Sequence, residues 1–316
     1  MKRGTAVKSV YLSLTTALLI GYAGLAMAIC DLAIRKLGSV VSYTSATGEY
    51  RPFDPNRYVV IEEFEITHER EACDFFVTFS ASQTGGFNRT MSHHGYTLAY
   101  EIHESVSRQN VLKDIPGAYI GEVLSGRFES GKQVGRLQFV IAIPPGQFVP
   151  PGQYKDRITL TAYEGTLTQH IWRDAKSVQI MAKIGSAIQL SLVPGGGAFD
   201  PDRRAYFLEL GQLSQGKTAQ VDLLVRNNTG YTIVIESENR GKLRQRDAAS
   251  PDSIAYELEV RGVRMQLTGR RERLDGISEI SSLQGDRYPI KVTIGSTEHA
   301  SAGTYRDNIT ITVRAN

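Results

Sequence analysis

"PPGQYKDRITLTA" (150–162) and "SAGTYRDNITITV" (301–313) repeat one pattern within the chain. After the tyrosine, apolar and polar residues alternate in both, as Ile309, Ile311 and Val313 do, which is the period of a half-buried β-strand. The first copy is followed by a long further stretch, whereas three residues follow the second. The same strand therefore occurs twice, with different surroundings.

Other segments repeat in the same order. "FDPNRYVV" (53–60) matches "FDPDRRAY" (199–206), and "LAYEIHE" (98–104) matches "IAYELEV" (254–260). We also align "CDFFVTF" (73–79) with "VDLLVRN" (221–227). Two long copies indicate two domains rather than a solenoid, which needs at least three short repeats.

The matched segments read as strands. Leu137, Phe139 and Ile141 alternate with other residues, turn signals such as "PGGG" (194–197) separate the segments, and no stretch has a sustained helical period. We therefore predict an all-β protein of two tandem immunoglobulin-like β-sandwiches. In the first copy, "SVQIMAKI" (177–184) follows as a closing strand. The second copy has no such segment, so we expect it to lack its final strand.

The first 28 residues have the order of a secretory signal. Lys2 and Arg3 precede an apolar run that ends in Ala26-Met27-Ala28. A membrane-spanning helix fits less well because the run is short and interrupted, and a lipidated Cys30 is disfavoured by Ile29 before it. We expect domains at 29–184 and 185–316, with no membrane span after cleavage.

Charge excludes one class of partner. The signal holds three of the 36 basic residues and none of the 33 acidic ones, which leaves 33 of each. A neutral exported chain is not expected to bind nucleic acid, because such binding needs a surplus of Lys and Arg.

The cysteines predict one disulfide. Cys30 and Cys73 are the two cysteines of the chain, and in an oxidising compartment an isolated pair is most simply bonded. A loop of this length gives roughly 3–4 kcal/mol of stabilisation in the chain-entropy model. His93, His94 and His103 have no carboxylate or cysteine pattern beside them, so we expect structural or surface histidines, no metal and no cofactor.

A repeated Gly-x-Tyr-x-Asp precedes the last strand of each copy, with Tyr154 and Asp156 in the first and Tyr305 and Asp307 in the second. A tyrosine at such a corner anchors its hydroxyl to nearby backbone, and the carboxylate caps the turn. We prefer this structural role to a catalytic pair, since no nucleophile or base lies beside it. We found no nucleophile elbow, metal-ligand cluster or phosphate loop, and we expect no enzyme.

Two further classes of protein stay open at this point. A glycosidase carboxylate pair cannot be recognised from sequence, because the separation of two acids is unknown. A sugar-binding module would rest on Trp172, the sole tryptophan.

The ending "(P/A)-G-x-Y-x-D-x-I-T-(L/I)-T", with the "AYE(I/L)" strand and the "FDP" turn, resembles the spore coat protein U domain. Subunits of archaic chaperone–usher pili share that domain. The resemblance implies a sandwich that lacks its last strand, which a periplasmic chaperone lends and the next subunit's N-terminal extension replaces. On this reading Leu223, Ile309, Ile311 and Val313 line the acceptor groove.

The resemblance also makes the chain ends interpretable. After cleavage the chain would begin at Ile29, and "CDLAIRKLG" (30–38) already matches the first strand of the second copy, so no donor segment remains. We therefore expect a tip subunit at the cell surface. Its partners would be the chaperone, the outer-membrane usher, the next subunit and a surface or host receptor. The alternative is a secreted structural coat or matrix protein with the same domains.

As a tip subunit, the first domain would be an adhesive head that promotes surface attachment and biofilm formation. Apolar residues among turn formers are its candidate contact loops, because exposed apolar area binds greasy surfaces by excluding water. The alternative is that each packs onto its own domain. The candidates are Phe87, Ile115, Pro116, Tyr119, Ile120, Phe148 and Val149.

Overall fold

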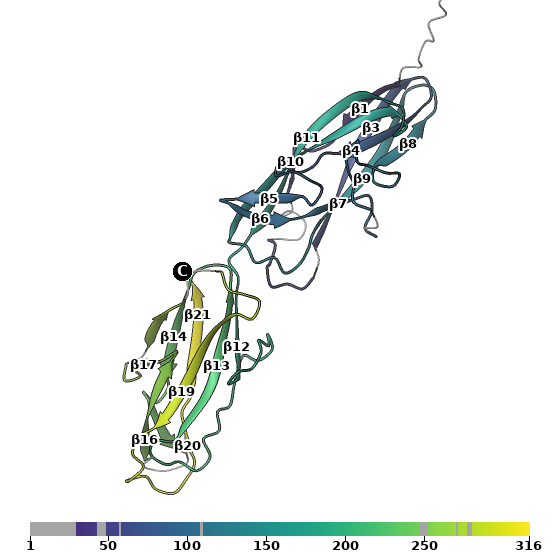
Figure 1. Ribbon diagram of the computed structural model, residues 1–316. Helices are drawn as coiled ribbons and strands as arrows, with labels where there is room; N and C mark the ends of the chain where they lie inside the picture. The colour runs from purple at the N-terminus through teal and green to yellow at the C-terminus, as the bar shows by residue number, and fades with distance from the viewer. Residues whose placement is uncertain are drawn as a thin grey trace, which may run out of the picture.

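The computed structural model describes residues 30–42, 49–56, 58–107, 110–246, 252–269, 271–276 and 280–316. The predicted signal at 1–28 lies outside these ranges. The regular structure within them is all β-strand, and they include no helix able to cross a membrane. Figure 1 shows two elongated units arranged end to end, which confirms the predicted all-β fold of two sandwiches.

The first unit packs two sheets around one core. One sheet has the order β1-β3-β9-β7, and the other has β2-β11-β10-β4-β8 with β5 and β6 attached beside it. The strands are β1 Cys30–Arg35, β2 Val40–Ser42, β3 Tyr58–Arg70, β4 Cys73–Phe79, β5 Thr90–His93, β6 Tyr96–Ala99, β7 Glu101–His103, β8 Leu124–Phe128, β9 Gln133–Ile143, β10 Gly152–Gly165 and β11 His170–Ile184. The core side chains come from both sheets and form one cluster, whose members run in sequence from Cys30 to Ile184.

The second unit repeats this plan with fewer strands. Its sheets have the orders β12-β13-β19-β16-β15-β20, with β17 beside β16, and β18-β14-β21. The strands are β12 Ile188–Pro194, β13 Thr218–Asn227, β14 Tyr231–Ser237, β15 Lys242–Gln245, β16 Ser253–Val260, β17 Val263–Met265, β18 Glu272–Asp275, β19 Asp286–Ile294, β20 Tyr305–Arg306 and β21 Ile309–Ala315. It has its own hydrophobic cluster.

Sheet order corrects part of the repeat alignment. β3 lies between β1 and β9, and β13 lies between β12 and β19, so "VDLLVRN" (221–227) in β13 corresponds to β3. "CDFFVTF" (73–79), which is β4, corresponds instead to β14, because each pairs with the repeated strand β10 or β21. The error arose because buried strands share one alternation, which does not identify a strand's position in the sheet.

One asparagine holds the junction of the two units. The buried Asn228 side chain donates from Nδ2 to the carbonyl oxygens of Val149 and Gly185, at 3.1 and 3.0 Å. Its Oδ1 accepts from the backbone N–H of Ala187 at 2.7 Å. Val149 lies in the first unit, and Gly185 and Ala187 lie in the connection between β11 and β12. The Asn228 side chain therefore bonds the first unit and this connection to the second unit.

The predicted disulfide is present between Cys30 and Cys73, whose Cα atoms lie 6.0 Å apart. It joins the start of β1 to the start of β4. These two strands belong to different sheets, so the bond ties the sandwich together at the end remote from the second unit (Figure 1).

The two repeated motifs bond to each other in both units. The hydroxyl of Tyr100 donates to Asp156 Oδ2 at 2.7 Å, and that of Tyr256 donates to Asp307 Oδ2 at 2.5 Å. Burial is the largest cause that raises the pKa of both tyrosines, so each hydroxyl remains a donor at neutral pH. The contact explains why the "AYE" and "GxYxD" motifs recur together.

The corner tyrosines anchor the same segments. Tyr154 donates to the carbonyl oxygen of Pro150 at 3.0 Å, and Tyr305 donates to that of Ser301 at 2.8 Å. Each bond reaches back four residues, which is the geometry of a corner tyrosine. Burial raises the pKa of Tyr154 to about 12.

Replacing Tyr100 with Phe should lower the free energy of unfolding of the first unit by about 1.5–3 kcal/mol, because the buried carboxylate of Asp156 loses a charge-assisted hydrogen bond. Urea titration of the full chain, followed by Trp172 fluorescence, measures this selectively because Trp172 is the sole tryptophan and lies in β11. Tyr119→Phe is the matched control at a 74% exposed position. Equal effects of the two substitutions would contradict the assigned role.

Candidate functional site

The last strand of the second unit has an unpaired edge. β21 pairs with β14 from Ile309↔Ser237 to Ala315↔Tyr231. Within the described residues no strand pairs with its other edge. The corresponding strand of the first unit, β10, has β4 on one edge and β11 on the other. β11 contains the "SVQIMAKI" segment (177–184), and the described second unit has no counterpart of it.

Side-chain burial reports the same difference. Ile158, Leu160 and Ala162 on β10 are completely buried. Ile309, Ile311 and Val313, the equivalent residues of β21, are half-buried and pack against one side of the core cluster. In the first unit β11 covers the core beside β10. The core of the second unit is therefore incompletely covered at the corresponding place, beside β21.

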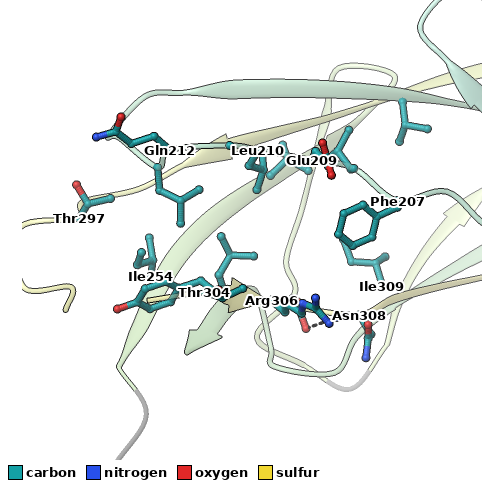
Figure 2. Close-up of a pocket in the computed structure, with 18 of the residues that line it drawn as sticks. Phe207, Glu209, Leu210, Gln212, Ile254, Thr297, Thr304, Arg306, Asn308 and Ile309 are labelled. Carbon is teal, nitrogen blue, oxygen red and sulfur yellow. Dashed lines mark hydrogen bonds between the residues drawn. The ribbon is translucent and has the colours of Figure 1, made fainter. Parts of the chain in front are cut away.

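A groove of about 1040 Å³ follows the open edge. Figure 2 shows one wall with Phe207, Leu210 and Gln212, and the facing wall with Thr304 and Ile309. Its floor is formed by core side chains of β13, β15, β16 and β19, namely Val221, Leu243, Ile254, Ile290 and Val292. The groove thus combines a free backbone edge with an apolar floor, which are the two surfaces that an added β-strand requires.

Two of the four predicted groove residues lie in it. Ile309 and Ile311 are among the residues that line the groove. The prediction for Leu223 is wrong, because this side chain is completely buried in β13, opposite Tyr288 of β19. Val221 of the same strand lines the groove instead. Val313 lies on β21 beyond the lining residues.

Sequence reasoning missed the second wall. Residues 204–213 belong to no strand, yet Leu208, Leu210 and Leu213 pack against the core while Phe207 is 70% exposed. The alternation of apolar residues in "YFLEL" (206–210) was the available signal. It marks a segment with strand character that has no paired neighbour in the described residues.

The predicted contact loops of the first unit separate into two groups. Tyr119 and Ile120 are 74% and 95% exposed, Pro116 beside them is exposed, and Ile115 is half-buried. Phe87 is half-buried, with the Arg89 guanidinium 5.3 Å from its ring centre. The 115–120 loop therefore presents the exposed apolar side chains among the candidates.

The expectation of an exposed contact is wrong for Val149, whereas Phe148 is half-buried. Val149 is 7% exposed and belongs to the core cluster, and Phe148 packs on Phe53 with ring centres 5.2 Å apart. The carbonyl of Val149 accepts the hydrogen bond from Asn228, so this loop lies at the junction of the units. Apolar residues beside turn formers were misjudged because their partners are distant in sequence.

The histidines predicted to be structural or on the surface make ordinary contacts. His103 is 4% exposed and bonds through Nδ1 to the carbonyl oxygen of Asn110 and through Nε2 to Glu101. The rings of His93 and His94 lie 4.3 Å apart and the His94 side chain is exposed.

The fold and the groove thus define one class of architecture, in which a closed immunoglobulin-like sandwich is joined to an incomplete one. No protein-family model matches the chain, so the spore coat protein U resemblance has no support from that comparison. No curated protein matches it either.

Solved structures similar to this chain include tip adhesins of chaperone–usher pili. One is a chain of the chaperone–tip adhesion subunit complex from the archaic Csu pili of Acinetobacter baumannii, with a TM-score of 0.45, 12% identity, and coverage of 89% of this chain and 99% of that one. CfaE, the adhesive subunit of the CFA/I fimbria of enterotoxigenic Escherichia coli, has a TM-score of 0.36, 13% identity and coverages of 89% and 94%. The CupB6 tip adhesin of Pseudomonas aeruginosa has a TM-score of 0.37 and 10% identity, with coverage of 89% of this chain and 94% of that one.

The 115–120 loop is exposed, whereas Val149 in the other predicted contact loop is buried, so substitution by Asp should affect the two loops differently. Val149→Asp should lower the free energy of unfolding of the first unit by several kcal/mol, because it buries an unpaired carboxylate. Ile120→Asp should change it by less than about 0.5 kcal/mol, since the side chain is in solvent. Urea titration with Trp172 fluorescence compares them. A destabilising Ile120→Asp would show that the 115–120 loop is packed.

Proposed function

We propose that this chain is a non-enzymatic adhesive subunit of a chaperone–usher pilus. The observation that carries the proposal is the apolar groove along the unpaired edge of β21. An extended segment of a partner would fill it, first from a periplasmic chaperone and then from the neighbouring subunit, and the usher would place the assembled subunit at the cell surface.

The first unit supplies a physical template for this addition. β11 lies antiparallel to β10, and its Val178, Ile180 and Ala182 are completely or almost completely buried between the sheets. A donated strand on β21 would make equivalent ladder hydrogen bonds and bury alternate side chains on the groove floor. The partner would supply both the hydrogen bonds and the buried side chains, so the second unit would connect this subunit to its partner.

The first unit would act as the head at the pilus tip. Its last strand is already in place, and its 115–120 loop exposes Tyr119 and Ile120 to solvent. Removing such side chains from water against an apolar surface is favourable by about 1.5–3 kcal/mol each. This supports attachment to surfaces, and biofilm formation would follow from it.

Strand addition can be tested within one chain. Appending residues 163–184 after Val313 would give β21 the hairpin that follows Ala162 in β10. We expect hydrogen exchange of the β21 amides to slow by about tenfold or more, because the free edge becomes a hydrogen-bonded ladder. Mass spectrometry of the peptide covering 305–313 measures the effect in the full chain.

The control carries the same appended hairpin with the residues from Val178 and Ile180 both replaced by Asp. It has the same length but cannot bury its side chains in the groove. Equal protection by both hairpins, or none by either, would sink the strand-acceptor assignment.

Attachment can be tested separately. Changing Tyr119 and Ile120 to Asp should weaken binding of the purified chain to hydrophobic beads by about tenfold or more, given the apolar area that is lost. Val134→Asp is the matched control, because Val134 is 53% exposed in β9. If Val134→Asp weakens binding equally, attachment is not specific to the 115–120 loop.

A further inference from the structure

The exposed 115–120 loop is closed at its base by bonds between two residues that flank it. The backbone N–H of Lys113 donates to the carbonyl oxygen of Glu122 at 2.8 Å. The side chains of the same two residues form an ion pair, with Lys113 Nζ 2.6 Å from Glu122 Oε1. Within the loop, the backbone N–H of Gly117 donates to the carbonyl oxygen of Asp114 at 3.2 Å. The loop is therefore an internally bonded unit.

The tip of the loop is a β-turn from Tyr119 to Glu122. The backbone N–H of Glu122 donates to the carbonyl oxygen of Tyr119 at 2.9 Å. Gly121 has a φ of 90°, which fits the third residue of a type II turn and favours glycine there. Ile120 is the second residue of the turn, and its side chain is 95% exposed. The turn therefore places Ile120 at its corner, in solvent.

The carboxylate of Glu122 bonds the tip and the base of the loop together. Its Oε2 accepts from the backbone N–H of Tyr119 at 3.0 Å, while its Oε1 accepts from Lys113 Nζ. The bond from Lys113 is the largest cause that lowers the pKa of the Glu122 carboxyl, and the bond from Tyr119 is the next, so the group is ionised at neutral pH. Both backbone polar groups of Tyr119 are thus bonded to Glu122.

A buried arginine ties the base of the loop to the core. Arg89 is completely buried, and its Nη2 donates to the carbonyl oxygens of Phe79 and Leu112 at 3.0 and 2.7 Å. Phe79 is the last residue of β4, and its backbone N–H donates to the carbonyl oxygen of Lys113 at 3.1 Å. Burial lowers the pKa of Arg89 to about 10, so its guanidinium is charged at neutral pH. The loop therefore begins from a fixed point at the end of β4.

We propose that Glu122 is the positioning residue of this contact loop and holds Tyr119 and Ile120 in one exposed arrangement before a surface is met. The proposal rests on the proposed function, in which these two side chains contact an apolar surface. Glu122 acts through the backbone of Tyr119 and needs no contact with the surface itself. A loop that is already ordered loses less conformational entropy when it binds, so the same apolar area gives tighter attachment.

Glu122→Ala in the full chain tests this, because it removes the carboxylate without removing apolar area from the loop. We expect hydrogen exchange of the peptide covering 114–122 to become faster by about tenfold or more. Binding of the purified chain to hydrophobic beads should weaken by about fivefold or more. Glu122→Gln loses the ion pair but keeps an oxygen that can accept from Tyr119, so it should retain most of the binding. This rescue separates the bond to the turn from the ion pair.

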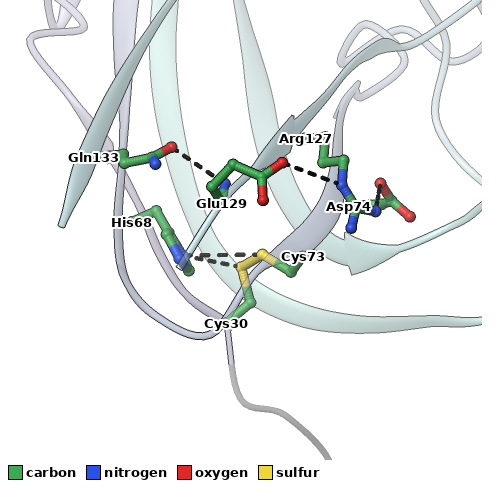
Figure 3. A network of polar contacts seen from close by, with 7 residues as sticks. All are labelled: Cys30, His68, Cys73, Asp74, Arg127, Glu129 and Gln133. Carbon is green, nitrogen blue, oxygen red and sulfur yellow. Dashed lines mark hydrogen bonds and ion pairs between the residues drawn. A yellow bond between two sulfur atoms is a disulfide. The ribbon is translucent and has the colours of Figure 1, made fainter. Parts of the chain in front are cut away.

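Glu129→Ala is the matched control, because it removes the same charge from the turn between β8 and β9. The Glu129 side chain is 75% exposed, and its Oε1 lies 3.7 Å from Arg127 Nε (Figure 3). This variant should change neither the exchange of the 115–120 loop nor the binding. Urea titration with Trp172 fluorescence should give Glu122→Ala and Glu129→Ala the same midpoint, since both side chains lie outside the core cluster.

Three results would overturn the positioning role. They are unchanged loop exchange in Glu122→Ala, a urea midpoint clearly below that of the control, and binding that Glu122→Gln fails to rescue. Failure of the proposed function gives a different pattern, because the Asp substitutions of Tyr119 and Ile120 would then leave binding unchanged. If those substitutions weaken binding and Glu122→Ala does not, the positioning role fails while the contact loop stands.

Discussion

The structure depends on one constraint: both edges of a β-strand carry backbone N–H and C=O groups that need partners. In the first unit β10 lies between β4 and β11, so its edges are satisfied within the chain. In the second unit β21 pairs with β14 on one edge. The half-burial of Ile309 and Ile311 and the groove beside them both follow from that difference.

Comparison of the two copies made the closed and open sandwiches predictable from sequence. The alternation of Val178, Ile180 and Ala182 indicated a strand, and the structure places it beside β10. A repeat supplies its own reference, because a segment present in one copy shows what the other would need. The disulfide was predictable for a simpler reason, since two cysteines allow one intramolecular pairing.

Properties that depend on contacts distant in sequence were not predictable. Alternation shows that one face of a strand is buried, but it does not say which strand lies beside it, and the alignment of β13 with β4 failed for that reason. Val149 looked like a loop residue, yet it packs in the core and its carbonyl accepts from Asn228 of the other unit. Nor could any local pattern bring His68 beside the disulfide, because its register with β1 sets that contact.

The repeated Tyr–Asp pair explains how β21 stays in register with one edge unpaired. Asp307, just before β21, accepts from Ser237 Oγ at 2.6 Å, from the backbone N–H of Asn239 at 2.9 Å and from Tyr256. These donors come from β14, the turn after it, and β16, so none of them occupies the free edge. The first unit has the equivalent bond from Tyr100 to Asp156 although its edge is closed. The anchor therefore belongs to the shared sandwich plan, and at this edge the described units differ in that β11 covers β10 whereas no described strand covers β21.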